Sequence, residues 1–459
     1  MNKIIVCIAL FLLASCGEKE KMSPTVFFAG EIINPTNDYV VLYKGDQVID
    51  SARLDANNRF SFSLDSVSEG LHHFYHHPEL QYIYFEKGDS LQARLNTTEF
   101  DESLVFSGKG EEVNNFLLEM FLINESEEEH VYSLYKLEPE DFIKSIDSLK
   151  DDKLQLLNDL NAESRLSDGA YEIARSGITY TNYISREAYP FYHKKKSGDK
   201  DFHVLPEGFY DYRKQIDFEN EHLTYLRPYY NFMKYHVGNL SYMACRKDCG
   251  GSVSVAHNQL HFNRHKLKCI DTLIKQKELR DNLFRNVAVD YLLKPDCEDN
   301  IKAFIDEFHQ LSGNNKHIEE INNLYEGIKK IQPNKEIPDV LVTDSEDNQV
   351  SLKDIANGRQ VVFYFWSGVE LGHFKNIKKR VAKLKKKHPE YTFVGINLRT
   401  DKLRWKTLVE AHNLDKTEQF WAGDFEDVAH TLIVYDPFKS IIAKDGRIVD
   451  AFANVYTSF

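Results

Sequence analysis

The chain has 459 residues, too many for one typical core, and this length predicts two or three domains. Hydrophobic residues make up 42% of the chain and aromatic residues 13%, which is enough for packed cores. The formal net charge of −14 is spread along the chain, so it argues against nucleic acid as a partner and indicates a solvated acidic surface.

The first residues have the pattern of a targeting segment. Lys3 supplies a positive charge, and the apolar run IIVCIALFLL after it is too short to cross a bilayer as a mature helix. The run leads into Leu13-Ala14-Ser15-Cys16, the lipobox pattern of bacterial lipoproteins. We therefore expect a signal peptide over 1–16, a lipid on Cys16 that anchors the protein to a membrane, and a polar tether over 17–24. The expected location is the bacterial cell envelope, on the periplasmic side or at the outer membrane.

An alternation of period two predicts a small antiparallel β domain over 25–106. The strand candidates alternate or run with β-branched and aromatic residues, as in YVVLYKG, RFSFSLD, LQYIYFEKG and SLQARLN. Turn residues lie between them in NPTND, DANN and EKGD. Four histidines stand in LHHFYHHPEL, at positions 72, 73, 76 and 77. A strand edge and a turn account for them better than a metal cluster does.

A period of 3.6 predicts an α-helical domain over 107–330. The segment FSGKGEEVNNFLLEMF marks the change of pattern, and LEPEDFIKSIDSLKDDKLQLLNDL and NIKAFIDEFHQL continue it.

This helical region contains a group of cysteines and histidines, which are Cys245, Cys249, His257, His261, His265, Cys269 and Cys297. From position 257 to position 269 they recur every fourth residue, so on a helix they would share one face. Three interpretations stay open: plain packing, a disulfide such as Cys245–Cys249, and a metal-binding helical domain. A zinc site needs ligands from two elements, and a stripe on one helix does not provide that. We therefore predict no metal and no other cofactor.

After the linker PNKEIPDV the pattern becomes β-α-β. The runs VVFYFW and YTFVGINL are continuously apolar, as buried parallel strands are. A helix lies between them, and TDKLRWKTLVEAHNL is a second helix with Leu403, Leu408 and Leu414 available to pack. Two strands around an Asp445-Gly446 turn follow the short helical segment EDVAHTLIV. This order predicts an α/β fold of thioredoxin type over 331–459.

The same residues resemble a known family. The segments IPDVLVTDSEDNQVSLKDIANGRQVVFYFW and KDGRIV are similar to the thioredoxin-like domain of the TlpA/ResA-type thiol–disulfide oxidoreductases. The whole order of domains resembles the multi-domain envelope lipoproteins of that family, which begin with a β domain of unknown function. Pro437 stands where the family keeps a cis-proline beside its active site, and this resemblance implies that the groove architecture is retained.

The catalytic motif of that family is absent here. Alignment on Trp366 places Glu370 and His373 at the two positions of the Cys-x-x-Cys motif. Exchange needs an activated thiolate and a resolving thiol, which a carboxylate and an imidazole cannot replace. We therefore expect no thiol–disulfide exchange at this motif, and we interpret Glu370 and His373 as degenerate positions.

The resemblance leaves a binding role for the fold. We expect a non-catalytic binding or scaffold module for polypeptide clients, with a groove lined by Trp366, Ser367, Gly368, Asp436 and Pro437. One rival is a thiol–disulfide oxidoreductase that uses Cys245 and Cys249, and another is the metal-binding helical domain.

Overall fold

The computed structural model describes residues 25–248 and 258–459. The predicted signal peptide, lipidated Cys16 and tether lie outside these residues. The chain divides between residues 236 and 237 into two compact units, called unit 1 and unit 2 below. None of the described helices combines the length and the hydropathy needed to cross a membrane.

Unit 1 begins with a β-rich region that contains two four-stranded sheets, in the strand orders β4-β1-β7-β8 and β3-β2-β5-β6. The strands are β1 (Val26–Ile33), β2 (Tyr39–Lys44), β3 (Gln47–Arg53), β4 (Arg59–Leu64), β5 (Gly70–His76), β6 (Glu79–Phe85), β7 (Ser90–Asn96) and β8 (Val105–Lys109), with the short helix α1 (Phe100–Ser103) before β8. Alternate side chains of β4 and β7 are buried, which is the period-two pattern that the sequence displays. The core of the region is aromatic. The centroid of the Phe28 ring lies no more than 6.0 Å from the ring centroids of Phe60, Phe62, Phe74 and Phe85.

The prediction that this region is purely antiparallel is wrong in one place. Strand β1 pairs with β7 in parallel, from Phe27 opposite Ser90 to Ile33 opposite Asn96. Hairpins impose the antiparallel direction only on strands that follow one another, and β7 returns to this sheet after the chain has built the second one. Strand β5, which carries His72, His73 and His76, is an interior strand between β2 and β6, so these histidines do not lie at a sheet edge.

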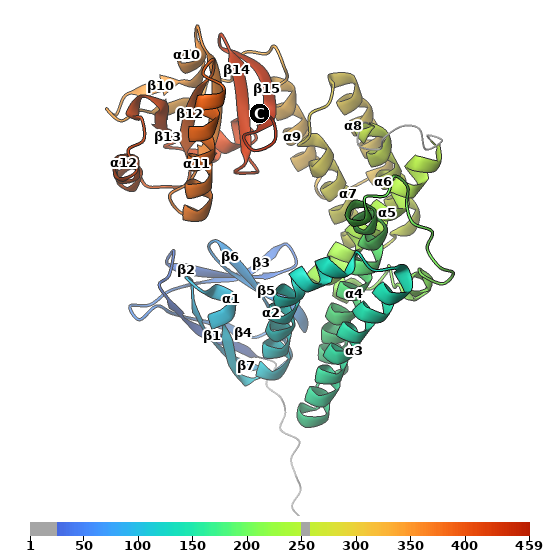
Figure 1. Cartoon of the computed structure of the whole chain (residues 1–459). Helices are drawn as coiled ribbons and strands as arrows, with labels where there is room; N and C mark the ends of the chain where they lie inside the picture. The colour runs from blue at the N-terminus through green and yellow to red at the C-terminus, as the bar shows by residue number, and fades with distance from the viewer. Residues whose placement is uncertain (1–24, 249–257) are drawn as a thin grey trace, which may run out of the picture. The chain divides into compact units, whose positions relative to one another are not determined.

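The helical part of unit 1 follows β8 (Figure 1). Its elements are α2 (Glu111–Leu134), α3 (Pro139–Ser164), α4 (Asp168–Ser197), η1 (Asp211–Gln215), η2 (Glu221–Leu223) and the first part of α5 (Arg227–Asp248). Local signals set the ends of α4: the Ser167 hydroxyl accepts a hydrogen bond from the Ala170 amide, and Gly198 takes a left-handed conformation with φ of 75°.

A buried ionic cluster fixes α4 to η1 and α5. Glu187 of α4 is 0% exposed. Its carboxylate accepts hydrogen bonds from Arg213 Nε at 2.9 Å, from Arg213 Nη2 at 2.5 Å and from His236 Nδ1 at 2.7 Å. Burial acts to raise the pKa of Glu187, but the hydrogen bonds from His236 and Arg213 outweigh it and lower that pKa. The buried charge is therefore held as a carboxylate.

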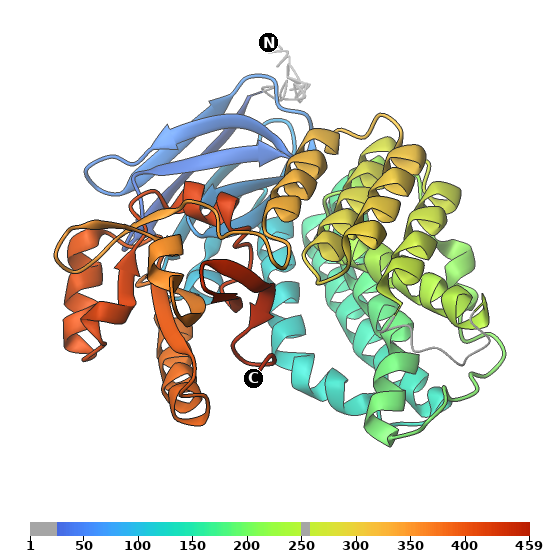
Figure 2. The same cartoon turned by 90° about the horizontal axis from the view of Figure 1, so that it is seen from above.

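Unit 2 begins with the end of α5, which is followed by a set of helices that lie side by side (Figure 2). They are α6 (Gln259–Leu273), α7 (Lys277–Leu292), α8 (Glu298–Ser312) and α9 (Ile318–Lys330).

The C-terminal part of unit 2 is a seven-stranded mixed sheet in the order β10-β9-β13-β12-β11-β14-β15. Its elements are β9 (Leu341–Thr343), β10 (Gln349–Ser351), α10 (Leu352–Ala356), β11 (Gln360–Trp366), α11 (Leu371–Lys387), β12 (Thr392–Asn397), α12 (Lys402–Ala411), η4 (Lys416–Glu418), β13 (Gln419–Trp421), α13 (Phe425–Thr431), β14 (Lys439–Lys444) and β15 (Arg447–Asn454). Strand β11 pairs in parallel with β12 and antiparallel with β14, and β14 pairs antiparallel with β15. The order β12-β11-β14-β15 with these directions is the thioredoxin-like core.

Candidate binding surface of the C-terminal domain

The strand-to-helix connection after β11 leads to Glu370 and His373, the two positions that the sequence comparison singled out. Glu370 is exposed at the N-cap of α11, and its side chain makes no capping hydrogen bond. His373 lies in the first turn, with Nε2 3.2 Å from the Phe365 carbonyl oxygen. This contact assigns the proton to Nε2, which donates to the carbonyl. A carboxylate at this helix end is favoured by the helix dipole, so Glu370 is stable there without a catalytic task.

The residues before the helix are buried, in contrast to the predicted groove lining. Trp366 is 2% exposed, and its Nε1 donates to Gln419 Oε1 at 3.1 Å. Ser367 is 6% exposed, and the Gly368 amide donates to the Thr400 hydroxyl at 2.7 Å. A Cβ on Gly368 would lie 2.7 Å from the Leu408 side chain and 2.8 Å from the Thr400 side chain, so a larger residue would force these side chains to move. These residues therefore support the loop from inside and do not line a surface.

The expected cis-proline is also absent. Among residues 25–248 and 258–459 the cis peptide bond is His77–Pro78, and the Asp436–Pro437 bond is trans. Asp436 opens a tight turn in which its side chain accepts from the Phe438 amide at 2.8 Å and its carbonyl accepts from the Lys439 amide at 3.1 Å. A trans-proline at the second position of such a turn is the ordinary case, so this turn needs no cis bond.

The structure nevertheless brings the helix start and the proline turn together. The His373 and Phe438 rings meet edge to face, with centroids 5.2 Å apart. Apolar side chains are exposed around this contact: Val369 is 47%, Leu371 43% and Phe438 44% exposed. We call Val369, Leu371, His373 and Phe438 the apolar patch.

A basic groove continues from this patch along α11. It has a volume of about 530 Å³ and is lined by Asn376, Lys379, Arg380, Lys383, Phe438, Asn454, Tyr456 and Thr457. Phe438 belongs to both the groove and the patch, so the two form one surface. Arg380 is held in place because it donates to the backbone carbonyls of Val455, Tyr456 and Phe459, whereas Lys379 and Lys383 are exposed.

Sequence reasoning missed a buried lysine beneath the proline turn. Lys439 is 7% exposed, and its ammonium group donates to the Leu432 and Ile433 carbonyls at 2.8 and 2.9 Å. It also lies 4.4 Å from the Phe452 ring centroid. Burial lowers the pKa of Lys439 from 10.5 to about 7, against a smaller opposing effect of Asp450.

Lys439→Met is expected to flatten the pH dependence of the stability of unit 2. The unfolded chain keeps this proton up to about pH 10.5 and the folded chain only to about pH 7, so folding stability rises between these values. The slope contributed by one such group is at most about 1.4 kcal/mol per pH unit. All tryptophans, Trp366, Trp405 and Trp421, belong to unit 2, so urea unfolding followed by their fluorescence from pH 7 to 9.5 measures it. Lys444→Met, at an exposed position of the same strand, is the control. Equal slopes in the two variants would contradict the prediction.

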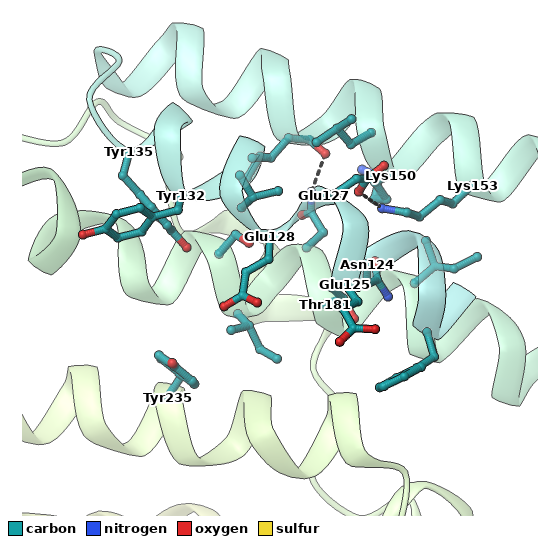
Figure 3. A pocket seen from close by; sticks show the side chains of 18 of the residues that line it. Asn124, Glu125, Glu127, Glu128, Tyr132, Tyr135, Lys150, Lys153, Thr181 and Tyr235 are labelled. Carbon is teal, nitrogen blue, oxygen red and sulfur yellow. Dashed lines mark hydrogen bonds and ion pairs between the residues drawn. The ribbon is translucent and has the colours of Figure 1, made fainter. Parts of the chain in front are cut away.

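Unit 1 contains a pocket that no sequence motif indicated. Its volume is about 520 Å³, and its walls come from α2, α3, α4 and α5. Figure 3 shows the carboxylates of Glu125 and Glu128 directed into this space, with Tyr235 on the opposite side. Lys153 closes one wall through an ion pair with Glu127 at 2.5 Å. Two lysines, Lys150 and Lys153, line the pocket together with Glu125, Glu127 and Glu128, so both signs of charge face it. The residues come from four helices, which is why spacing in the sequence gave no signal.

The described cysteines of the helical region belong to helices other than α11. Cys245 is buried on α5, Cys269 is partly buried on α6, and Cys297 is exposed at the start of α8. Cys249 and His257 lie outside the described residues, so a Cys245–Cys249 disulfide and its use in exchange stay predictions.

Comparison with known proteins found no matching family model and no matching curated protein. Solved structures do match. The thioredoxin domain of a thiol–disulfide oxidoreductase from Bacteroides vulgatus is 22% identical, with 26% of this chain and 86% of that chain covered and a TM-score of 0.22. A domain of a possible thiol–disulfide isomerase from Cytophaga hutchinsonii is 16% identical, with 27% and 86% covered and a TM-score of 0.24. A thioredoxin-like protein from Bacteroides caccae is 12% identical, with 55% and 91% covered and a TM-score of 0.33.

The strand order and strand directions around β11 define the fold independently of these similarities. The C-terminal part of this chain is a thioredoxin-like domain, with Glu370 and His373 at the start of α11.

Proposed function

We propose that this protein is a lipid-anchored protein of the cell envelope whose thioredoxin-like domain binds polypeptide clients without thiol–disulfide exchange. The anchor is the lipid on Cys16, and the binding site is the α11 surface made of the apolar patch and the basic groove.

The proposal rests on two features of the same place: the start of α11 has no cysteine, and apolar side chains beside it are exposed to solvent. Glu370 and His373 cannot form a mixed disulfide, yet Leu371 and Phe438 beside them stay 43% and 44% exposed. Exposed apolar side chains that gather around a groove are typical of interaction sites. A domain that only had to fold would not need these apolar side chains to be exposed.

The charge of the surface favours one class of client. Lys379 and Lys383 line the groove, and the N-terminus of α11 adds a partial positive charge. We therefore propose an extended polypeptide segment that carries carboxylates next to an apolar anchor residue. Because Pro437 is trans, recognition depends on side chains and electrostatics and not on the backbone pairing of the resembled family.

Binding of defined peptides tests this. A fluorescent twelve-residue unstructured peptide of glutamate and leucine is expected to bind the full chain, and its lysine–leucine counterpart is expected not to. Phe438→Ser and the pair Lys379→Glu with Lys383→Glu should each weaken binding about tenfold or more, because a hot-spot anchor or two attractive charges are lost. Fluorescence anisotropy measures the affinity, which should fall as salt is raised.

Leu403→Ser is the matched control, since Leu403 is 77% exposed on α12 of the same domain but belongs to neither the patch nor the groove. It should bind like the wild type. Equal affinity for both peptides, or an unchanged affinity in Phe438→Ser, would rule out the α11 surface as the site.

A further inference from the structure

The end of α5 and the start of α6 place four side chains of metal-ligand type on facing positions within unit 2. Cys245 and Asp248 are three residues apart on α5, and His261 and His265 are four residues apart on α6. Both spacings put the two residues of a pair on the same side of their helix. Ligands from two elements are the condition that the stripe on one helix did not meet in the sequence.

Contacts between the two helices bring these groups together. Cys245 Sγ lies 3.0 Å from His261 Nδ1, and His265 Nε2 lies 3.1 Å from Asp248 Oδ2. The rings of His261 and His265 are adjacent, with centroids 4.6 Å apart. One ligand atom each of Asp248, His261 and His265 lies within 4.8 Å of the others. Two ligands of a tetrahedral zinc ion are about 3.4 Å apart, as follows from zinc–nitrogen distances of about 2.1 Å. Asp248, His261 and His265 therefore need only small side-chain movements to meet around one ion, and Cys245, which contacts His261, is the candidate for the fourth ligand.

The chemical nature of the four ligand atoms indicates which metal ion the site would bind. A thiolate with two imidazoles and one carboxylate suits Zn²⁺, whereas Ca²⁺ and Mg²⁺ prefer oxygen ligands only. Cys245 is 0% exposed, so a thiolate there would be shielded from solvent and from oxidants. We propose that Cys245, Asp248, His261 and His265 bind one zinc ion that joins α5 to α6.

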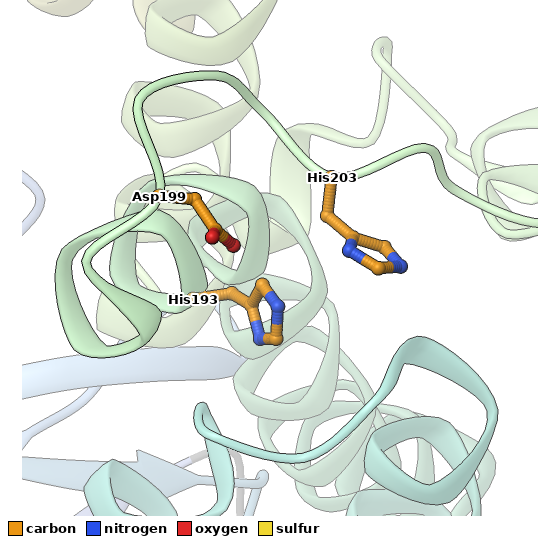
Figure 4. Close-up of side chains that lie close together, drawn as sticks. All are labelled: His193, Asp199 and His203. Carbon is orange, nitrogen blue, oxygen red and sulfur yellow. The ribbon is translucent and has the colours of Figure 1, made fainter.

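A second group of candidate ligands, in unit 1, provides a comparison. His193 of α4, with Asp199 and His203 from the loop after it, also has ligand atoms within 4.8 Å of one another (Figure 4). This group has no thiol, and Asp199 and His203 are exposed. His203 Nε2 is 3.2 Å from Glu138 and His193 Nδ1 is 2.9 Å from the Tyr135 carbonyl, so ordinary hydrogen bonds account for both rings. This makes His203 a suitable control position.

Cobalt substitution of the whole protein tests the proposal. The protein is stripped of metal with a chelator under reducing conditions and titrated with Co²⁺, and then with Zn²⁺ in competition with a chromophoric chelator. We expect one equivalent to bind, an intense tetrahedral d–d band, and a thiolate-to-cobalt charge-transfer band. Absence of the charge-transfer band in the wild type would overturn the four-ligand site without the need for any variant.

Variants then locate the ion. His265→Ala should weaken zinc binding by about 100-fold or more, since losing a direct ligand exceeds the effect of losing an outer-sphere group. Cys245→Ser should remove the charge-transfer band, whereas Cys297→Ser, at an exposed position, should keep it. His203→Ala should bind like the wild type. Loss of metal in His203→Ala with retention in His265→Ala would overturn the assignment, and far-UV circular dichroism checks that each variant is folded.

Discussion

Replacing Glu187 by glutamine is expected to lower the free energy of unfolding of unit 1 by about 3–5 kcal/mol. The glutamate is 0% exposed and carries the acceptors for both Arg213 and His236. Glutamine has nearly the same volume, so the loss comes from charge and hydrogen bonding and not from a cavity. Its amide group would face Arg213 with donors where the carboxylate offers acceptors, and the partly buried guanidinium would be left without its counter-charge.

The two units allow this effect to be localised. Unfolding of the helices of unit 1 contributes strongly to far-UV circular dichroism, whereas tryptophan fluorescence reports on unit 2 alone. Urea unfolding of Glu187→Gln should therefore shift part of the dichroism transition and leave the fluorescence transition in place. Asp38→Asn, which breaks the exposed Arg53–Asp38 pair of the same unit, is the control and should leave both transitions in place.

The pH dependence gives a second readout of the same group. Because the pKa of Glu187 is lowered from 4.5, its stabilisation is complete above about pH 4.5 and is lost as the pH falls through the folded-state pKa. The stability difference between wild type and Glu187→Gln should therefore shrink on acidification below about pH 4.5. A difference that stays constant down to pH 3 would contradict a role for the buried charge.

Local patterns in the C-terminal sequence carried most of the information on its fold. Every residue from Val361 to Trp366 is buried on β11, which lies inside the sheet between β12 and β14, and a continuous apolar run is typical of such a strand. The turn at Asp445 and Gly446 has φ of 50° and 73°, which is the geometry that this pair favours between hairpin strands. The packing of α12 was harder to predict: Leu403 is exposed, and Trp405 and Val409 are buried instead. Leucines at irregular spacing do not fix which side of a helix faces the sheet.

The candidate sites depend on contacts that spacing alone does not encode. The sequence shows a histidine stripe on α6, but it does not show that Asp248, at the end of α5, lies close to His261 and His265 of that stripe. The trans bond before Pro437 and the burial of Trp366 also follow from tertiary packing, since a proline and a tryptophan at these positions are compatible with either outcome. The family resemblance correctly predicted that the start of α11 and the turn at Pro437 lie together. It wrongly predicted that Trp366, Ser367 and Gly368 line a surface.

Introducing two thiols by Glu370→Cys with His373→Cys is expected to give the start of α11 a disulfide chemistry that a carboxylate and an imidazole cannot perform. Position 370 caps α11 and position 373 lies in its first turn, so two cysteines there would be within the Cα separation that a disulfide allows. The helix N-terminus lowers the pKa of a thiol placed at position 370, which favours the attacking thiolate. In an insulin-reduction assay with dithiothreitol as the reductant, the double variant should exceed the wild type by about tenfold or more.

Single and distant variants separate this prediction from the rival use of Cys245. Glu370→Cys alone should form mixed disulfides but should not turn over, because no second thiol resolves them. Cys245→Ser should change neither the wild type nor the double variant, since the exchange would take place at α11. If the wild type reduced insulin and Cys245→Ser abolished that activity, the helical region would be the redox site. If the double variant formed no disulfide under oxidising conditions, the start of α11 would differ from the redox-active geometry in more than its missing sulfurs.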